Sequence, residues 1–408
     1  MKGTADTFKW ILVVGARPNF MKIAPLIRAI AAHNNKNGNR IEPFLVHTGQ
    51  HYDVRMSDAF FRDLQLPEPD VHLGVGSGNH GEQTGKVLIE FEKILLQEQP
   101  DLVIVVGDVN STLACALAAV KLHIPVAHVE AGLRSFDRDM PEEINRIVTD
   151  AISDFLFTPS PDGDEHLLGE GIPKEKIFLV GNIMIDSLLF NLEQAKKTSI
   201  LSLLGLSNSN ADENPAMPSI PYALLTLHRP ASVDNRETFN RILAGLLEVA
   251  LRIPVIFPMH PRTRKQMHTF GLDGNFVFHD ALPVDMSSYR DQNGLMPKIH
   301  CFEPFGYLDF LQLMANAKVV LTDSGGIQEE TTVLGIPCVT LRDSTERPIT
   351  VTEGTNVLVH DDPQKIVAEV SQVLEGRSRK GRRPDLWDGQ TAERIVTTLR
   401  EKLFSAIG

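Results

Sequence analysis

Short, uninterrupted apolar runs alternate with longer amphipathic segments along the whole chain, and this alternation restricts the possible folds more than any other feature. The apolar runs are rich in β-branched residues and occur at 11–14, 44–47, 102–106, 126–129, 178–180, 222–227, 255–258, 299–302, 319–321 and 338–341. Amphipathic segments between them include 21–32, 111–121, 236–251 and 327–334. Strands that are apolar on both faces and separated by helices indicate parallel sheets covered on both sides. We therefore predict an α/β fold of doubly wound parallel sheets.

The length and an internal echo predict two such domains. A chain of 408 residues exceeds the size of one ordinary core. Residues 100–132 and 317–343 both read strand, aspartate, small-residue turn, helix, Ile-Pro and strand, so each half carries the same unit. The likeliest seam, 187–221, contains a stretch rich in Asn, Ser and Pro. We expect an N-terminal Rossmann-like domain over 1–190 and a second over 191–389, with a last helix at about 390–408 packing back on the first.

Composition excludes several classes of protein. The 40 basic and 52 acidic residues give a formal charge of −12, so no nucleic-acid partner is expected and a bound anion needs local donors. The three cysteines form no CxxC pair, and no HxH or HExxH spacing occurs, which argues against disulfides and a metal site. No apolar run approaches the roughly 20 residues of a membrane helix, and the one before Arg17 is too short for a secretory signal. We expect a cytoplasmic protein.

Residues 317–348 contain the clearest candidate binding site. A short apolar run ends at Thr322 and Asp323, turns through Ser324, Gly325 and Gly326, and enters a helix predicted to begin near Ile327. The first amides of a helix are unpaired and lie at the positive end of its dipole, so they favour an anion. Glu330 follows in the first turns, and carboxylates accept hydrogen bonds from ribose hydroxyls. A nucleotide or nucleotide-sugar is the leading ligand; the alternative is a merely structural Gly-Gly turn.

Charged residues also follow strands in the first half. Arg17 and Lys22 come after the first strand and suit phosphate oxygens, although Arg17 could be a surface ion pair. Asp108, Glu130 and Glu142 follow later strands or loops. Asp108 could simply cap the next helix. A carboxylate directly after a buried run, as Glu130 is, needs a task or a partner, and Arg134 and Arg146 are available as structural partners.

In the second half, His228 and His260 each end a strand, and either could donate to a phosphate or transfer a proton. A histidine at a strand end is equally often structural. Arg347 lies after the strand at 338–341 and offers a further cation near the glycine turn. Ligands of open α/β sheets bind beyond the carboxyl ends of the strands, so we expect these candidates to line a cleft between the two domains.

Taken together, these segments resemble the non-hydrolysing UDP-N-acetylglucosamine 2-epimerase family, which has the GT-B fold of two Rossmann-like domains. The resemblance spans nearly the whole chain in order, and DSGGIQEE with HVEAGLR is its most specific part. The matching segments are GARPNFMKIAP (15–25), TGQH (48–51), GDVNSTLA (107–114), HVEAGLRS (128–135), PEEINR (141–146), VGN (180–182), LHRP (227–230), LTDSGGIQEE (321–330) and RDSTERP (342–348).

The resemblance implies a role for each candidate. Asp108, Glu130 and Glu142 match the acid/base carboxylates of the family, and His228 would contact phosphate or sugar. UDP would sit in the second domain. Its contacts would be Ser324, Gly325, Gly326 and Glu330 for diphosphate and ribose, Arg347 nearby, Phe310 near the uracil, and Arg17 and Lys22 completing the phosphate and sugar contacts.

The implied reaction is reversible epimerisation of UDP-N-acetylglucosamine (UDP-GlcNAc) to UDP-N-acetylmannosamine (UDP-ManNAc). The family eliminates UDP across C1–C2 to give a glycal and adds it back after a proton returns to the opposite face. No cofactor and no metal are expected, and the first domain contains no GxGxxG. The partners implied are a UDP-sugar substrate and a second copy in a homodimer, with no membrane.

Three positions depart from the pattern of some relatives. Asp53 and Glu82 stand where some bacterial members carry a glutamine and an arginine of a second, regulatory UDP-GlcNAc site, so such regulation is in doubt here. Phe305 stands where some relatives have a glutamine, after the proline of the loop near 304.

Other functions stay open at this stage. Within the fold they are a C2 epimerase of a modified UDP-sugar such as a diacetamido-uronate, a hydrolysing epimerase, and a glycosyltransferase. A non-catalytic nucleotide-sugar sensor is the alternative from another class.

Overall fold

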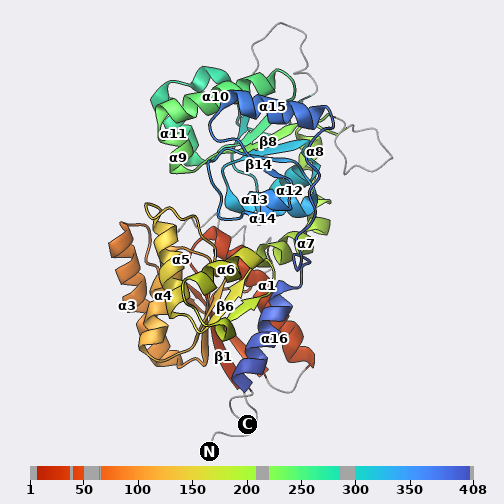
Figure 1. Ribbon diagram of the computed structural model, residues 1–408. Helices are drawn as coiled ribbons and strands as arrows, with labels where there is room; N and C mark the ends of the chain where they lie inside the picture. Colours follow the sequence, from red (N-terminus) through yellow and green to blue (C-terminus); the bar gives the residue numbers. More distant parts are fainter. Residues whose placement is uncertain are drawn as a thin grey trace, which may run out of the picture. The chain divides into compact units, whose positions relative to one another are not determined.

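The computed structural model describes residues 7–36, 40–49, 64, 66–207, 220–284, 286 and 299–404. The chain divides into two compact units. Unit 1 comprises residues 1–190 together with 385–408, and unit 2 comprises residues 191–384. Each unit is built on one seven-stranded sheet whose paired strands are all parallel, which confirms the predicted α/β class (Figure 1).

The sheet of unit 1 has the strand order β3-β2-β1-β4-β5-β6-β7. Its strands are β1 (Thr7–Val14), β2 (Arg40–His47), β3 (Val71–His72), β4 (Leu102–Val106), β5 (Val126–Val129), β6 (Phe155–Thr158) and β7 (Ile177–Leu179). The central strands β4 and β5 are buried at every residue because helices cover both faces of the sheet. Strand β1 lies inside the sheet, between β2 and β4, as in a doubly wound fold.

Seven helices belong wholly or mainly to unit 1 within its described part. They are α1 (Arg17–Lys36), α3 (His80–Glu98), α4 (Asn110–Lys121), α5 (Pro141–Ile152), α6 (Pro161–Gly169), α7 (Ile183–Ala195) and α16 (Thr391–Phe404). Helices α3, α4 and α5 lie on one side of the sheet, and α1 and α16 lie side by side on the other (Figure 1).

The sheet of unit 2 has the strand order β10-β11-β9-β8-β12-β13-β14. Its strands are β8 (Ala223–Thr226), β9 (Val255–Pro258), β10 (Phe276–His279), β11 (Ile299–Phe302), β12 (Val319–Thr322), β13 (Cys338–Thr340) and β14 (Asn356–Leu358). Its helices are α8 (Ile200–Leu203), α9 (Pro230–Val233), α10 (Arg236–Ala250), α11 (Pro261–Phe270), α12 (Tyr307–Asn316), α13 (Gly325–Leu334), α14 (Ile349–Thr352) and α15 (Pro363–Leu374). Helices α10 and α15 pack together over one face, while α12 and α13 lie on the other (Figure 1).

The repeated sequence unit occupies the same place in both sheets. In unit 1, β4-α4-β5 follows β1 in the strand order, and in unit 2, β12-α13-β13 follows β8. The internal echo in the sequence therefore marks equivalent positions of two related sheets.

Four strands escape the sequence pattern. The predictions missed β3, β6, β10 and β14, which are only two to four residues long. Helix α13 also begins at Gly325, two residues before the predicted start at Ile327. Periodicity over so few residues does not separate a strand from a loop, and the ends of elements depend on backbone contacts that composition does not fix.

The last segment of the chain returns to unit 1 through named contacts. Trp387 is buried, and its indole N–H donates to the carbonyl of Pro159 at 2.8 Å. The carboxylate of Asp186 accepts from the amides of Thr391 and Ala392 at 3.1 and 2.7 Å and so caps α16. The returning backbone passes so close to Gly181 that a Cβ there would lie 2.1 Å from the Leu386 carbonyl oxygen.

We predict that Gly181→Ala destabilises unit 1 far more than Gly171→Ala. Both glycines have positive φ, +92° and +85°, so alanine costs about 1 kcal/mol of backbone strain at either site. Only at Gly181 must the returning chain also move, which adds about 1–3 kcal/mol. Urea-unfolding midpoints followed by Trp387 fluorescence measure the difference. Equal losses in the two variants would contradict the close approach.

Candidate functional site

In unit 1, Lys22 and Glu130 form a buried ion pair at the carboxyl ends of the strands. Glu130 directly follows β5 with φ +72°, and its amide donates to the Phe157 carbonyl at 3.0 Å. Gly107, with φ +67°, leaves room for the pair, because a Cβ there would lie 2.7 Å from Lys22 Nζ. The partner of Glu130 is thus Lys22, and neither Arg134 nor Arg146 pairs with it in the described contacts.

Asp108, which follows Gly107, pairs with Arg146 at 2.5 Å. Its side chain is 30% exposed, and its backbone carbonyl accepts from the Asn145 amide at 2.9 Å. Helix α4 begins at Asn110 after Val109, so Asp108 is not its N-cap residue. A carboxylate that is held by an arginine yet still reaches solvent is placed to contact a ligand.

Helix α5 presents two neighbouring glutamates in different ways. Glu142, the sequence candidate, is exposed in the first turn. Glu143 is buried and accepts from the amides of Ser135 and Phe136 at 3.0 and 2.9 Å and from Arg146 at 2.7 Å. Burial alone would raise the pKa of Glu143, but these hydrogen bonds lower it overall. Sequence reasoning missed this structural role, although consecutive residues of a helix necessarily face in different directions.

Asn19 is a second residue that the sequence candidates omitted. Its side-chain oxygen accepts from the amides of Gly15 and Ala16 at 3.2 and 2.9 Å, and its amide group donates to the Val106 carbonyl at 2.9 Å. It therefore joins the turn after β1 to the end of β4. The structure places Lys22, Asp108 and Glu130 near this link between β1 and β4.

In unit 2, the turn after β12 is fixed by Asp323. This buried carboxylate accepts from the amides of His228 and Arg229 at 2.9 and 2.7 Å and lies 3.3 Å from His228 Nδ1. It thereby joins the ends of β12 and β8 and leaves the His228 ring 43% exposed. Ser324 is the N-cap residue of α13, and its side chain makes no capping hydrogen bond in the described structure. The first amides of α13 are thus free of a side-chain cap, as an anion site requires.

Arg347 lies against this turn. A Cβ on Gly325 would lie 2.5 Å from a guanidinium nitrogen of Arg347, so a side chain at this position would displace the guanidinium. Arg347 Nε is 2.8 Å from Glu329, and its NH1 is 3.5 Å from Glu346.

Glu346 also pairs with Arg229 and Arg342 at 3.4 and 2.8 Å. Burial works to raise the pKa of Glu346, but the hydrogen bond from Arg342 and the charges of Arg229 and Arg347 hold it well below its usual range. One carboxylate thus gathers three arginines beside the start of α13.

Glu330 differs from every other candidate carboxylate of unit 2. It is buried, and the Tyr307 hydroxyl lies 3.5 Å from it. Burial and the neighbouring charge of Glu329 raise the pKa of Glu330 to about 8. Phe310, the candidate for a base contact, is half-buried one turn after Tyr307 on α12. A carboxyl group kept neutral in the ligand-free protein is well placed to ionise when hydroxyl donors arrive.

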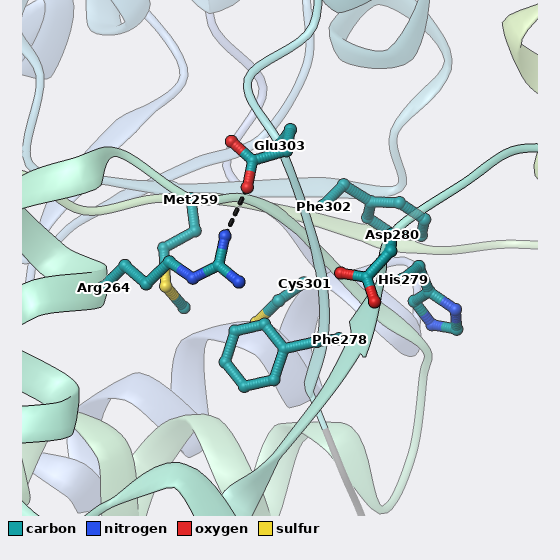
Figure 2. Close-up of a pocket in the computed structure, with 8 residues that line it drawn as sticks. All are labelled: Met259, Arg264, Phe278, His279, Asp280, Cys301, Phe302 and Glu303. Carbon is teal, nitrogen blue, oxygen red and sulfur yellow. Dashed lines mark hydrogen bonds and ion pairs between the residues drawn. The ribbon is translucent and has the colours of Figure 1, made fainter.

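A small pocket opens at the carboxyl ends of β9, β10 and β11 (Figure 2). It is lined by Met259, Arg264, Phe278, His279, Asp280, Cys301, Phe302 and Glu303. Arg264 points across it to Glu303, with which it forms an ion pair (Figure 2). Strands β9 and β8 separate β11 from β12 in the sheet, so this pocket is not the glycine turn. His260 follows β9, next to the pocket residue Met259, and its ring lies 5.7 Å from that of His228.

Some sequence candidates lie outside the described part. Nothing is described for the side chain of Arg17, which opens α1, or for Asp53 and the second half of TGQH. Glu82 is exposed and pairs with Lys86 at 2.6 Å. In the described ranges, no group of three or more His, Cys, Asp or Glu side chains is arranged to hold a metal ion. None of the described helices is both long and apolar enough to cross a membrane.

Comparison with known proteins is consistent across sequence and structure. Residues 33–400 match the family described as UDP-N-acetylglucosamine 2-epimerase. A Methanocaldococcus jannaschii protein of that name is 45% identical over 394 residues, covering 96% of this chain and 98% of that one. The UDP-2,3-diacetamido-2,3-dideoxy-D-glucuronate 2-epimerase of Pseudomonas aeruginosa is 38% identical over 394 residues, covering 96% and 99%.

Solved structures give the same result. The M. jannaschii UDP-GlcNAc 2-epimerase in complex with UDP-GlcNAc and UDP has a TM-score of 0.80 at 44% identity, covering 96% of this chain and 99% of that one. The UDP-GlcNAc 2-epimerase of Neisseria meningitidis bound to UDP-GlcNAc has a TM-score of 0.79 at 31% identity, covering 97% and 100%. The GT-B fold expected from the sequence is therefore confirmed.

The opposite pKa shifts of Glu330 and Glu346 predict opposite effects of removing their charges. Because the pKa of Glu330 is raised from 4.5 to about 8, its proton is bound more tightly in the folded state, and stability falls as pH rises through this window. Glu330→Gln should therefore raise the melting temperature of the ligand-free protein at pH 9 by at least about 3 °C and change it little at pH 4.5.

Glu346→Gln is the matched control. The lowered pKa of Glu346 gives stability that is present above its unfolded value of 4.5 and is lost as pH falls toward the folded value. This variant should melt lower than the parent at pH 7 and pH 9, with a smaller gap at pH 4. Calorimetry at these pH values measures both variants. A Glu330→Gln protein that is less stable at pH 9 would show that Glu330 is buried as an anion.

Proposed function

The chain belongs to the UDP-N-acetylglucosamine 2-epimerase family, and we propose that it reversibly inverts C2 of UDP-GlcNAc to give UDP-ManNAc. The observation that carries this proposal is the pair of carboxylates at the strand ends of unit 1, Asp108 with Arg146 and Glu130 with Lys22. In each pair the carboxylate lies against the cationic end of a buried lysine or arginine, and Asp108 directly follows Gly107 in the chain. Relatives at 41–45% identity over nearly the whole chain carry the name of this activity.

The chemistry explains why such carboxylates are needed. The C2 proton of the sugar is not acidic, so direct abstraction is unfavourable. Anti-elimination breaks the C2–H bond and the C1–O bond, giving a glycal, UDP and a proton held by the protein. Delivering a proton that has exchanged with solvent to the opposite face of C2, with UDP re-adding at C1, forms the epimer. We assign proton transfer to Asp108, Glu130 and Glu142, with His228 beside the departing phosphate.

Unit 2 supplies the donors for the leaving group. We propose that the hydroxyl of Ser324, the amides at Gly325 and Gly326 and the guanidinium of Arg347 hold the diphosphate, because α13 begins there without a side-chain cap from Ser324. Glu330 would accept from the ribose hydroxyls and Phe310 would contact the uracil. Arg17 and Lys22 would complete the phosphate and sugar contacts.

We also propose that the protein acts in the cytoplasm as a homodimer and supplies an activated sugar for polysaccharide biosynthesis. The apparent mass from light scattering at micromolar concentration tests the homodimer. A mass of 45.2 kDa, that of one chain, would contradict it.

Solvent-isotope exchange tests the proposed reaction. Incubation with UDP-GlcNAc in D₂O should place deuterium at C2 of both UDP-GlcNAc and UDP-ManNAc, as followed by proton NMR, because a proton from solvent returns to the glycal. Turnover of UDP-2,3-diacetamido-glucuronate alone would assign the activity of the P. aeruginosa relative instead. Binding without deuterium at C2 of either sugar would indicate a sensor, and free sugar released with UDP would indicate hydrolysis.

Asp108→Asn and Glu130→Gln should each lower kcat by at least about 100-fold, since each removes a proton-transfer group. UDP binding, measured by calorimetry, should stay within a few-fold of the parent because unit 2 is unchanged. Glu90→Gln is the control, since Glu90 pairs with Lys93 on the exposed face of α3 and should leave both quantities unchanged. Loss of UDP binding in parallel with kcat would make Asp108 and Glu130 structural.

Gly325→Ala tests the anion site separately. The new methyl group would displace the Arg347 guanidinium, so UDP affinity should fall by at least about tenfold, the effect of about 1.4 kcal/mol. Gly335→Ala is matched, because Gly335 ends the same helix and no atom lies within 4 Å of the position of its Cβ. Calorimetry with UDP measures both. Equal affinities in the two variants would place the diphosphate elsewhere.

A further inference from the structure

His128 lies on β5, two residues before Glu130, and its side chain is fully buried. Its Nδ1 is 2.6 Å from a carboxylate oxygen of Asp150, which lies on α5. Its Nε2 is 2.8 Å from the backbone carbonyl oxygen of Gly107. The ring therefore joins a buried carboxylate to the residue that separates Asp108 from the end of β4.

Both neighbours of the His128 ring are hydrogen-bond acceptors. The Gly107 carbonyl can only accept. Asp150 also accepts from the Gly132 amide at 3.1 Å and lies 2.8 Å from Arg134, so its carboxylate is ionised. Burial would raise the pKa of Asp150, but the charges and hydrogen bonds of His128 and Arg134 lower it overall. Each ring nitrogen of His128 must then carry a hydrogen, which makes the ring an imidazolium.

The charged groups in contact around the ring include two carboxylates, Asp150 and Glu170, and one arginine, Arg134. Arg134 is held on its far side by Glu170, which accepts two hydrogen bonds at 2.7 Å each. His128 and Arg134 thus alternate with Asp150 and Glu170 in a row of four charges, in which His128, Asp150 and Arg134 are buried and Glu170 is 37% exposed. A buried imidazolium is tolerated here because its carboxylate partner is also buried and hydrogen-bonded.

Gly107 is held on both sides by β5. Its amide donates to the Val129 carbonyl at 3.1 Å, and its carbonyl accepts from His128. Gly107 has a left-handed conformation, φ +67°, and its lack of a side chain leaves room for Lys22 beside Glu130. Asp108 is the next residue in the chain. The peptide that follows Gly107 therefore has its orientation set by the His128 ring.

We propose that His128 is a positioning residue whose imidazolium, oriented by Asp150, clamps the Gly107 carbonyl and so fixes the placement of Asp108 relative to Glu130. His128 does not touch the reacting atoms. This inference rests on the epimerase activity proposed above, because the placement matters only if Asp108 and Glu130 handle protons.

Two substitutions separate the hydrogen bond from His128 to Gly107 from the one to Asp150. The amide nitrogen of glutamine can reach the position of Nε2, so His128→Gln keeps a donor for Gly107 and loses the one for Asp150. The amide nitrogen of asparagine reaches the position of Nδ1, so His128→Asn keeps the donor for Asp150 and loses the clamp. Both remove the positive charge, and neither changes unit 2.

We expect His128→Asn to lower kcat by about 100-fold and His128→Gln by no more than roughly fivefold, since misplacing a catalytic group by about 1 Å has an effect of the larger size. KM for the UDP-sugar and the affinity for UDP should change less than about threefold in both. Equal losses of kcat, or a larger loss in His128→Gln, would overturn the clamp.

Nitrogen NMR of the unsubstituted protein labelled with ¹⁵N-histidine tests the protonation state without depending on the folding of a variant. The ring of His128, which is fully buried, should show both nitrogens protonated at pH 7.5. A single protonated nitrogen would overturn the inference. Absence of epimerase activity in the unsubstituted protein would contradict the proposed function instead, a failure distinguishable from equal behaviour of the two variants.

Discussion

A carboxylate buried at the end of a parallel strand must be paired with a cation, and this constraint organises unit 1. Glu130 has Lys22, and the buried Arg146 has Asp108, whose side chain is 30% exposed. Removing one partner of such a pair leaves an uncompensated buried charge, at a cost of about 3–5 kcal/mol. The two partners of each pair therefore hold each other in place before any ligand arrives. Preorganised charges of this kind stabilise a transition state without reorganising during the reaction.

In unit 2, two buried glutamates have arginine partners and a third differs. Glu346 is surrounded by arginines, and Glu329 lies beside Arg347. Glu330 has Tyr307 nearby instead of a cation, and burial raises its pKa to about 8. A buried carboxyl group of this type releases its proton when ligand donors replace solvent. UDP binding should therefore be coupled to the charge of Glu330, whereas the ion pairs elsewhere change little.

Much of the fold follows from the sequence because apolar runs of four or more residues report burial directly. The strands β4 and β12 were predicted from their apolar runs, and the turn at Ser324 was predicted with α13 beginning two residues too late. Short strands such as β14 carry too few residues for a periodic signal. The repeated strand-turn-helix unit also marked where each sheet would present its polar residues.

The identity of each partner could not be read from the sequence. Glu130 pairs with Lys22, which lies 108 residues earlier, whereas the arginines nearest in sequence pair elsewhere. The distinction between Glu142 and Glu143 depends on which side of α5 is buried, and Glu143 lies on the buried side with Arg146, three residues later on the same helix. His128 carried no signal beyond its place in a buried strand, because its role depends on acceptors supplied by β4 and α5.

Positional isotope exchange tests most directly whether the reaction proceeds by loss and return of UDP. UDP-GlcNAc carrying ¹⁸O in the bridge between C1 and the β-phosphorus is incubated with the protein, and the label is located by phosphorus NMR. Elimination to a glycal predicts that ¹⁸O moves into the non-bridging β-phosphate positions at a rate comparable to epimerisation, because the freed phosphate rotates before it re-adds. Epimerised product with all of its ¹⁸O still in the bridge would contradict cleavage of the C1–O bond.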